Sequence, residues 1–169
     1  MNDSTAAKNR RRFLTGGVAA GLASGTIVSL AGQTAGAAGA TPNSLSLMGL
    51  QPDGAPADDS GYTPGILAEG VQRVVFVSGQ GPEDYDADME TQIRQTFTRI
   101  GKVLDAAGAT FENIVILRSF FVHLARDLPA YRKVRKEFLK QPYPASTAVG
   151  TTELAIPGLM IEIEAVAVL

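Results

Sequence analysis

Two amphipathic segments alternate with β-rich runs in the C-terminal part of this chain, and this order limits the fold more strongly than any other feature. Apolar residues recur at spacings of three and four over residues 89–107 and 128–139, which predicts two helices. Runs rich in β-branched, aromatic and other apolar residues predict strands at 66–68, 74–77, 114–124, 145–151 and 159–168. This order predicts an α+β fold in which a sheet carries both helices on one face.

Capping and turn residues set the expected limits of these elements. Asp88 is a candidate N-cap of the first helix, Gly108 is its candidate stop, and Asp127 is a candidate N-cap of the second helix. Residues 69–73 contain a glycine between two β-rich runs and are interpreted as a hairpin turn. Residues 45–50 are a candidate edge strand within a segment rich in Pro, Gly and Asp.

The apolar positions indicate which surfaces are covered. The charged side of the second helix is interpreted as solvent-exposed and comprises Arg132, Lys133, Arg135 and Lys136. The strands carry more apolar surface than two helices cover, at Phe120, Phe121, Leu159, Ile161 and Ile163. We therefore expect neighbouring copies of the chain to cover the second face of the sheet.

The N-terminus has the organisation of an export signal. Arg10, Arg11 and Arg12 precede Phe13-Leu14, and a weakly apolar, glycine-rich run follows. This pattern predicts a twin-arginine signal and a mature protein that is periplasmic or extracellular, with membrane contact only through the signal. An uncleaved membrane tether and a chance basic cluster are the alternatives. The expected division is a signal over 1–40, a loop-rich segment over 41–60 and one domain over 61–169.

Charge and composition exclude several kinds of site. Of 15 Lys/Arg and 17 Asp/Glu residues, four basic and one acidic lie in residues 1–40, so the remaining chain carries a net charge of −5. An acidic chain is a poor partner for phosphate backbones, and no nucleic acid is expected. The absence of cysteine and the single histidine exclude a disulfide framework, a thiol nucleophile and a His-rich metal site within one chain. No cofactor and no metal are expected.

Four short motifs occur in an order that resembles one known family. They are VFVSGQ at 75–80, LDAAGA at 104–109, PASTAV at 144–149 and IEIEAVA at 161–167. Together they resemble the RidA/YjgF family of enamine and imine deaminases over about residues 61–169. The resemblance implies a chorismate-mutase-like α+β fold. It also implies a homotrimer whose sheets form a central barrel, with small-molecule sites in clefts between subunits.

The resemblance also implies how the site works. In active members of the family a water attacks an imine carbon and ammonia leaves, so the protein must orient substrate and water rather than supply a strong nucleophile. The family's arginine for the substrate carboxylate, in a Pro-Ala-Arg-Ser block, is replaced here by Ser146. Glu162 and Ser146 are therefore the candidate catalytic residues. The candidate substrate-binding residues are Tyr62, Ser78, Gly79, Gln80, Thr147 and Arg118. Arg118 is the candidate for a displaced carboxylate grip, that is, an arginine at another position that binds the substrate carboxylate.

Three functions follow as alternatives. The first is an exported hydrolase that acts on a small imine or enamine, which need not carry a carboxylate. The second is a trimeric module that binds or senses a metabolite without chemistry, because the family's arginine is lost. The third is a ribonuclease, which the acidic charge and the single histidine oppose.

Overall fold

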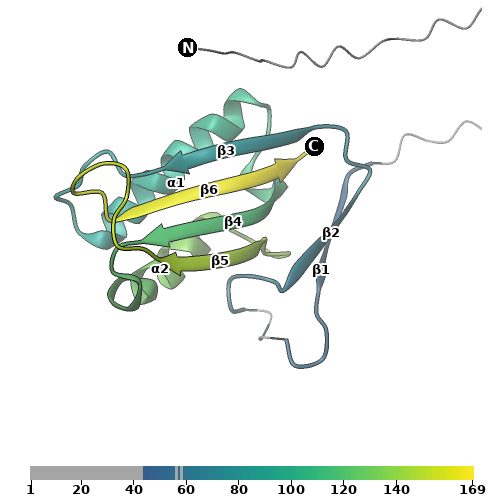
Figure 1. Cartoon of the computed structure of the whole chain (residues 1–169). Coiled ribbons are helices and arrows are strands. Elements are labelled where there is room, and N and C mark those ends of the chain that lie inside the picture. Colours follow the sequence, from purple (N-terminus) through teal and green to yellow (C-terminus); the bar gives the residue numbers. More distant parts are fainter. Residues whose placement is uncertain (1–43, 56, 58) are drawn as a thin grey trace, which may run out of the picture. The chain divides into compact units, whose positions relative to one another are not determined.

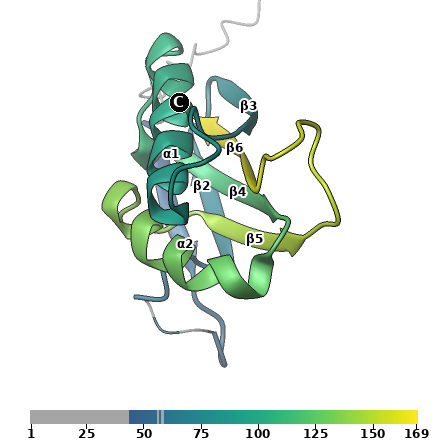
Figure 2. The same ribbon diagram turned by 90° about the vertical axis from the view of Figure 1, so that its left-hand side faces the viewer.

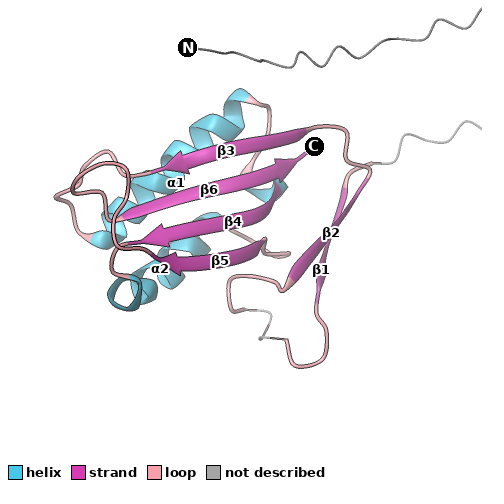
Figure 3. Ribbon diagram, in the orientation of Figure 1, coloured by secondary structure: helices cyan, strands magenta, loops and turns pink. Residues whose placement is uncertain are grey.

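The computed structural model describes residues 44–55, 57 and 59–169, and the signal expected over residues 1–40 lies outside the described residues. Figures 1 and 3 show the elements. In chain order they are β1 (Ser46–Leu50), β2 (Gly65–Glu69), β3 (Val74–Gln80), α1 (Met89–Ala106), a 3₁₀ turn (Phe111–Asn113), β4 (Ile114–Phe121), α2 (Leu124–Phe138), β5 (Ala145–Gly150) and β6 (Ile161–Val168).

The main sheet has four strands in the order β3-β6-β4-β5. Strand β6 is antiparallel to both of its neighbours, while β4 and β5 run parallel to each other. Both helices lie along one face of this sheet (Figure 2), which we call the helix face; the opposite face is called the open face. The predicted α+β fold with both helices on one side is confirmed.

The core lies between the helices and the sheet because each element turns one apolar side inward. The inward side of α1 comprises Ile93, Phe97, Ile100 and Leu104, all fully buried. In β6 the apolar residues at 161, 163, 165 and 167 are buried, while 162, 164 and 166 turn to the open face. Asp88 caps α1 as predicted, by accepting a hydrogen bond from the Thr91 backbone N–H at 3.0 Å.

The predicted boundary between the third long strand and the second helix is wrong by several residues. Strand β4 ends at Phe121, and α2 already begins at Leu124. Asp127 is therefore not the cap but lies inside the first turn, where its backbone N–H donates to the His123 carbonyl. Its buried carboxylate accepts two hydrogen bonds from the adjacent Arg126, at 2.6 and 3.0 Å.

The hairpin predicted at residues 69–73 is also wrong. Strand β2 pairs with β1 in a separate two-stranded sheet, while β3 pairs with β6. The backbone N–H groups of Gln72 and Arg73 both donate to the carbonyl of Leu169, at 2.7 and 2.8 Å. This loop therefore joins two sheets rather than two paired strands.

The expected set of apolar residues on the uncovered face of the sheet is largely wrong. Of the five residues expected to exceed what the helices cover, four are buried within the chain: Phe121, Leu159, Ile161 and Ile163. Only Phe120 lies on the open face, opposite Glu162 in the β4–β6 register. The open face nevertheless carries exposed apolar side chains, chiefly Phe76, which is 77% exposed, with Val74 and Val149.

Ion pairs connect the outer sides of the two helices. Arg94 of α1 binds the carboxylate of Glu137 of α2 through two hydrogen bonds of 2.8 Å. Lys133 of α2 reaches back to Glu90 of α1 at 2.7 Å, and Glu90 also contacts Arg94. Neither helix, among the described residues, combines the length and apolarity that a membrane span requires.

Candidate functional site

The predicted site residues fall into two groups on opposite faces of the sheet. The first, the Glu162 group, lies on the open face and at the end of β3; it comprises Glu162, Ser78, Gly79, Gln80 and Arg118. The second, the Ser146 group, comprises Ser146 and Tyr62 and lies on the helix-face side of β5. The register explains the division: Ser146 pairs with Leu117, which is buried toward the helices, whereas Glu162 pairs with Phe120.

Glu162 lies directly against the glycine of the Ser-Gly-Gln turn. A Cβ at position 79 would collide with the Glu162 carboxylate, so any larger residue would require this side chain to move from its observed position. The carboxylate is partly buried and has no hydrogen-bond or ion-pair partner among the described residues. A partly buried carboxylate without a protein partner is able to accept a hydrogen bond from water or from a ligand.

The turn at the end of β3 is held by its own side chain. The β3–β6 register shifts between Val77 and Gln80, which leaves the intervening residues outside regular pairing. The Gln80 side-chain amide donates to the carbonyls of Ser78 and Gly79, at 3.1 and 3.2 Å. These bonds fix the backbone that carries Gly79 beneath Glu162.

Arg118, the candidate displaced carboxylate grip, already has a carboxylate partner. Its Nη1 donates to Oε1 of Glu164, its register partner on β6, at 2.7 Å. Both side chains are substantially exposed on the open face, beside Phe76 and Ser78. Arg118 would have to leave Glu164 before it could bind a substrate carboxylate.

The Ser146 group borders a cavity of about 360 Å³ between β5 and α2. Ser146 and Ala148 line it from β5, and Tyr62 lines it from the segment before β2. Thr63 anchors that segment, since its hydroxyl donates to the Tyr143 carbonyl at 2.8 Å and its N–H donates to the Pro144 carbonyl at 3.3 Å. Thr147 also lines this cavity, but in the β4–β5 register it pairs with Arg118, which belongs to the Glu162 group. Thr147 therefore lies between the Ser146 group and the Glu162 group.

Arg135 also lines this cavity, although the sequence placed it on an exposed charged side. It is only 4% exposed, and its guanidinium lies 4.9 Å from the centre of the Tyr131 ring. Its Nε and Nη2 have no hydrogen-bond partner among the described residues. The helical spacing carries a signal for this position, because Arg135 is four residues after Tyr131, which belongs to the apolar stripe.

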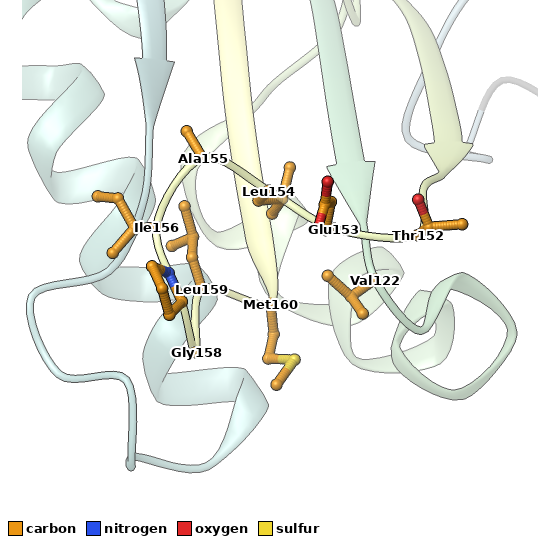
Figure 4. Close-up of a pocket in the computed structure, with 10 residues that line it drawn as sticks. Val122, Thr152, Glu153, Leu154, Ala155, Ile156, Gly158, Leu159 and Met160 are labelled. Carbon is orange, nitrogen blue, oxygen red and sulfur yellow. The ribbon is translucent and has the colours of Figure 1, made fainter.

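A larger cavity lies elsewhere, under the loop between β5 and β6 (Figure 4). It measures about 500 Å³ and is lined by Val122 and residues 152–160. Apolar residue types predominate in its lining, and Glu153 is the one ionisable side chain among the residues that line it. One ionisable side chain alone does not provide a set of catalytic groups that converge on a substrate. Within the described ranges, no cluster of three or more His, Asp or Glu side chains is placed to hold a metal ion.

Known proteins resemble this chain over most of the described region. The sequence profile of the family described as Endoribonuclease L-PSP matches residues 53–169. A 2-iminobutanoate/2-iminopropanoate deaminase from Dermatophagoides farinae is 33% identical over 105 residues, which cover 59% of this chain and 80% of the relative. A protein of the same name from Capra hircus is 31% identical over 120 residues, which cover 68% and 84%.

Solved structures agree with the sequence relatives. A Rid-family protein of unknown function from Yersinia pestis, YyfB, superposes with a TM-score of 0.65 at 28% identity, and covers 73% of this chain and 98% of its own. RidA from an Antarctic Psychrobacter superposes with a TM-score of 0.54 at 27% identity, and covers 72% and 99%. The fold, the order of the motifs and these matches lead to one conclusion: the chain belongs to the RidA/YjgF family.

Proposed function

We propose that the mature chain is an exported hydrolase of the RidA type, which releases ammonia from small reactive imines or enamines at clefts between copies of itself. The names of similar proteins support the reaction class, since the two sequence relatives described above are 2-iminobutanoate/2-iminopropanoate deaminases. The observation that carries the proposal is the carboxylate of Glu162, which is partly buried against Gly79 and unpaired among the described residues.

The proposed reaction adds water across a C=N bond and then breaks the C–N bond. Glu162 accepts a proton from the attacking water while the new C–O bond forms, and it passes this proton to the nitrogen. The new hydroxyl then gives up its proton as the C–N bond breaks, so that the nitrogen leaves as ammonia and Glu162 is regenerated. The remaining carbon product is a ketone or an aldehyde. Because the imine carbon is already electrophilic, the main contribution of the protein to the reaction rate is to hold water and substrate in contact.

The division of the candidate residues supports a site built from more than one chain. The Glu162 group and the Ser146 group lie on opposite faces of the same sheet, so neither group can reach the other through it. The exposed Phe76 and Val149 on the open face favour association with further copies. A homotrimer that sets the open face of one copy against the β5 edge of the next would bring the two groups together.

An ammonia-release assay tests the reaction. Imines are generated in solution by an amino-acid oxidase, and ammonia formation is followed with and without the purified mature protein. We expect acceleration over the uncatalysed rate, and a loss of about 100-fold or more in Glu162→Gln, because this change removes the proton acceptor but keeps the shape. Glu112→Gln, an exposed glutamate on the 3₁₀ turn, is the matched control and should retain full activity.

The same assay distinguishes the hydrolase from the binding module. A protein that accelerates no imine, yet binds a small ligand, contradicts the hydrolase and supports a trimeric metabolite-binding or sensing protein that lacks the family's arginine. Cleavage of RNA in parallel reactions would instead support the activity that the name of the family profile indicates.

Mixed assemblies test whether the site is shared between subunits. Glu162→Gln alters one group, and Ser146→Trp blocks the other by filling the cavity between β5 and α2. If neighbouring chains contribute the two groups, a refolded equal mixture of the variants regains about a quarter of wild-type activity, because about one interface in four pairs two intact groups. A mixture no more active than its parents contradicts a shared site.

Export requires a separate test. The paired arginines of the N-terminus support transport of the folded chain by the twin-arginine route. The double variant Arg10→Lys, Arg11→Lys is expected to remain in the cytoplasm of the producing cell, as measured by fractionation. Unchanged export of this variant would refute the signal.

A further inference from the structure

A buried cation lies beside the position where the family's arginine is missing. Arg135 extends from α2 into the wall of the cavity that Ser146 lines from β5. Ser146 occupies the place of the arginine in the family's Pro-Ala-Arg-Ser block. The cavity therefore retains a guanidinium, but α2 supplies it instead of β5.

The surroundings of Arg135 leave its charge uncompensated. Burial lowers the pKa of this guanidinium, which shows that the environment disfavours the charged form. The Tyr131 ring stacks against it, but no carboxylate among the described residues accepts a hydrogen bond from its Nε or Nη2. A buried charge without a hydrogen-bonded partner is unfavourable, so this position favours any ligand that supplies an acceptor.

The remaining walls of the cavity match an anion. Its lining includes two arginines, Arg132 and Arg135, and no acidic residue, although the chain beyond residue 40 is acidic overall. Ser146 and Tyr62, which both carry hydroxyl groups, are among the residues that line the same space. Apolar side chains of Leu124 and Leu128 form another part of the wall and suit a short carbon chain. A cavity of about 360 Å³ accommodates a small organic acid.

The backbone beside Arg135 also has an arrangement that requires glycine. Gly61 has φ of +87°, and a Cβ at this position would lie 3.6 Å from Nε of Arg135. The segment of Tyr62 therefore packs closely over the guanidinium stem. Nε and Nη2 of Arg135 are shielded from solvent and have no hydrogen-bond partner among the described residues.

We propose that this cavity binds the carboxylate of a small organic acid, with Arg135 of α2 as the grip that replaces the family's arginine on β5. This inference rests on the proposed function, since it identifies the substrates as imines that carry a carboxylate. It assigns to Ser146 the role of leaving space for the displaced guanidinium. Arg118 is then free to remain paired with Glu164.

Ligand binding without turnover tests the inference. The probe is 2-oxobutanoate, the 2-oxo acid that hydrolysis of 2-iminobutanoate would release, and its neutral counterpart is 2-butanone. Titration calorimetry on the mature protein is expected to show binding of the acid and at least tenfold weaker binding of the ketone. Arg135→Met removes the charge at similar volume and is expected to weaken acid binding at least tenfold, without changing the affinity for the ketone.

Two further variants separate a binding role from a structural one. Lys140→Gln removes one positive charge from an exposed position outside the cavity and should leave the affinity for the acid unchanged. Arg135→Lys keeps the charge but loses the planar fork, so we expect an intermediate affinity. Equal affinity of wild type and Arg135→Met for the acid overturns the proposal. So does a wild type that binds the acid no better than the ketone.

The outcomes also separate this inference from the proposed function. Ammonia release without selective binding of the acid would leave the hydrolase intact and remove the carboxylate grip. Selective binding without ammonia release would retain the grip and contradict the hydrolase. Dissociation of the assembly in Arg135→Met, together with absence of acid binding by wild type, would show that a carboxylate of a second copy occupies Arg135, which also overturns the proposal.

Discussion

The two faces of the sheet place the same residue type in opposite environments. Phe97 of α1 is fully buried on the helix face, where its ring lies 4.9 Å from that of Phe138 and 6.2 Å from that of Phe111. Phe76 of β3 is 77% exposed on the open face. Phe97 is therefore buried by other residues of its own chain, whereas the described residues leave most of Phe76 exposed.

This difference indicates what each face is for. The helix face holds the chain together, because its apolar residues alternate regularly and pack against two helices. The open face holds functional groups instead: an unpaired carboxylate at Glu162, an ion pair between Arg118 and Glu164, and exposed apolar side chains. One face can be explained from one chain, and we propose that a neighbouring copy covers the other.

The largest expected effect on stability comes from the helix face. Phe97→Ala removes a ring from the centre of the core and should lower the free energy of unfolding by about 3–5 kcal/mol. Denaturant unfolding of the mature protein at several concentrations measures this loss. A change below about 1 kcal/mol would show that this face is not the main source of stability.

Phe76→Glu provides the matching test on the open face. The change should alter the stability of a single subunit by less than about 0.5 kcal/mol, because this side chain is mostly exposed. It should nevertheless dissociate the assembly, since it places a charge where a neighbour is expected. Sedimentation measures the effect, with Ile156→Glu in the β5–β6 loop as a control that keeps the assembly. An assembly that survives Phe76→Glu would contradict burial of the open face.

The smallest expected effect concerns the ion pairs between the outer sides of α1 and α2. Lys133 lowers the pKa of Glu90, and Arg94 lowers the pKa of Glu137. A carboxylate whose pKa is lowered in the folded state contributes stability above its ordinary pKa of 4.5 and loses that contribution as the pH falls through the folded value. The difference in melting temperature between wild type and Arg94→Gln should therefore shrink as the pH falls below about 4.5. A difference that is constant across this range would contradict a role for these pairs.

The sequence predicted the covered elements well, because a periodic apolar stripe is a local signal. The range of α1 and its cap at Asp88 followed directly from spacing and capping rules. The start of α2 was missed because Asp127 is a plausible cap by type, while tertiary packing let the helix begin earlier. The hairpin between β2 and β3 was predicted wrongly because the N–H groups of residues 72 and 73 donate to the carbonyl of Leu169. This residue is distant in sequence, so no local pattern indicates the contact.

The site was predictable only in part, for the same reason. The family motifs identified Glu162 and the turn at Gly79, and the structure places these two residues in contact. Arg135 was assigned to solvent because three neighbouring residues of the helix are also charged. Its spacing of four residues from Tyr131 was the one local signal for burial, and its place in the cavity between β5, α2 and the Tyr62 segment depends on tertiary packing.

The mass of the mature protein in dilute solution tests the central claim, that the open face and the β5 edge form sites with neighbouring copies. Sedimentation equilibrium of the folded protein without residues 1–40 should give three times the mass of one chain. A folded protein that sediments with the mass of a single chain, while circular dichroism and thermal unfolding show an intact core, would contradict the account.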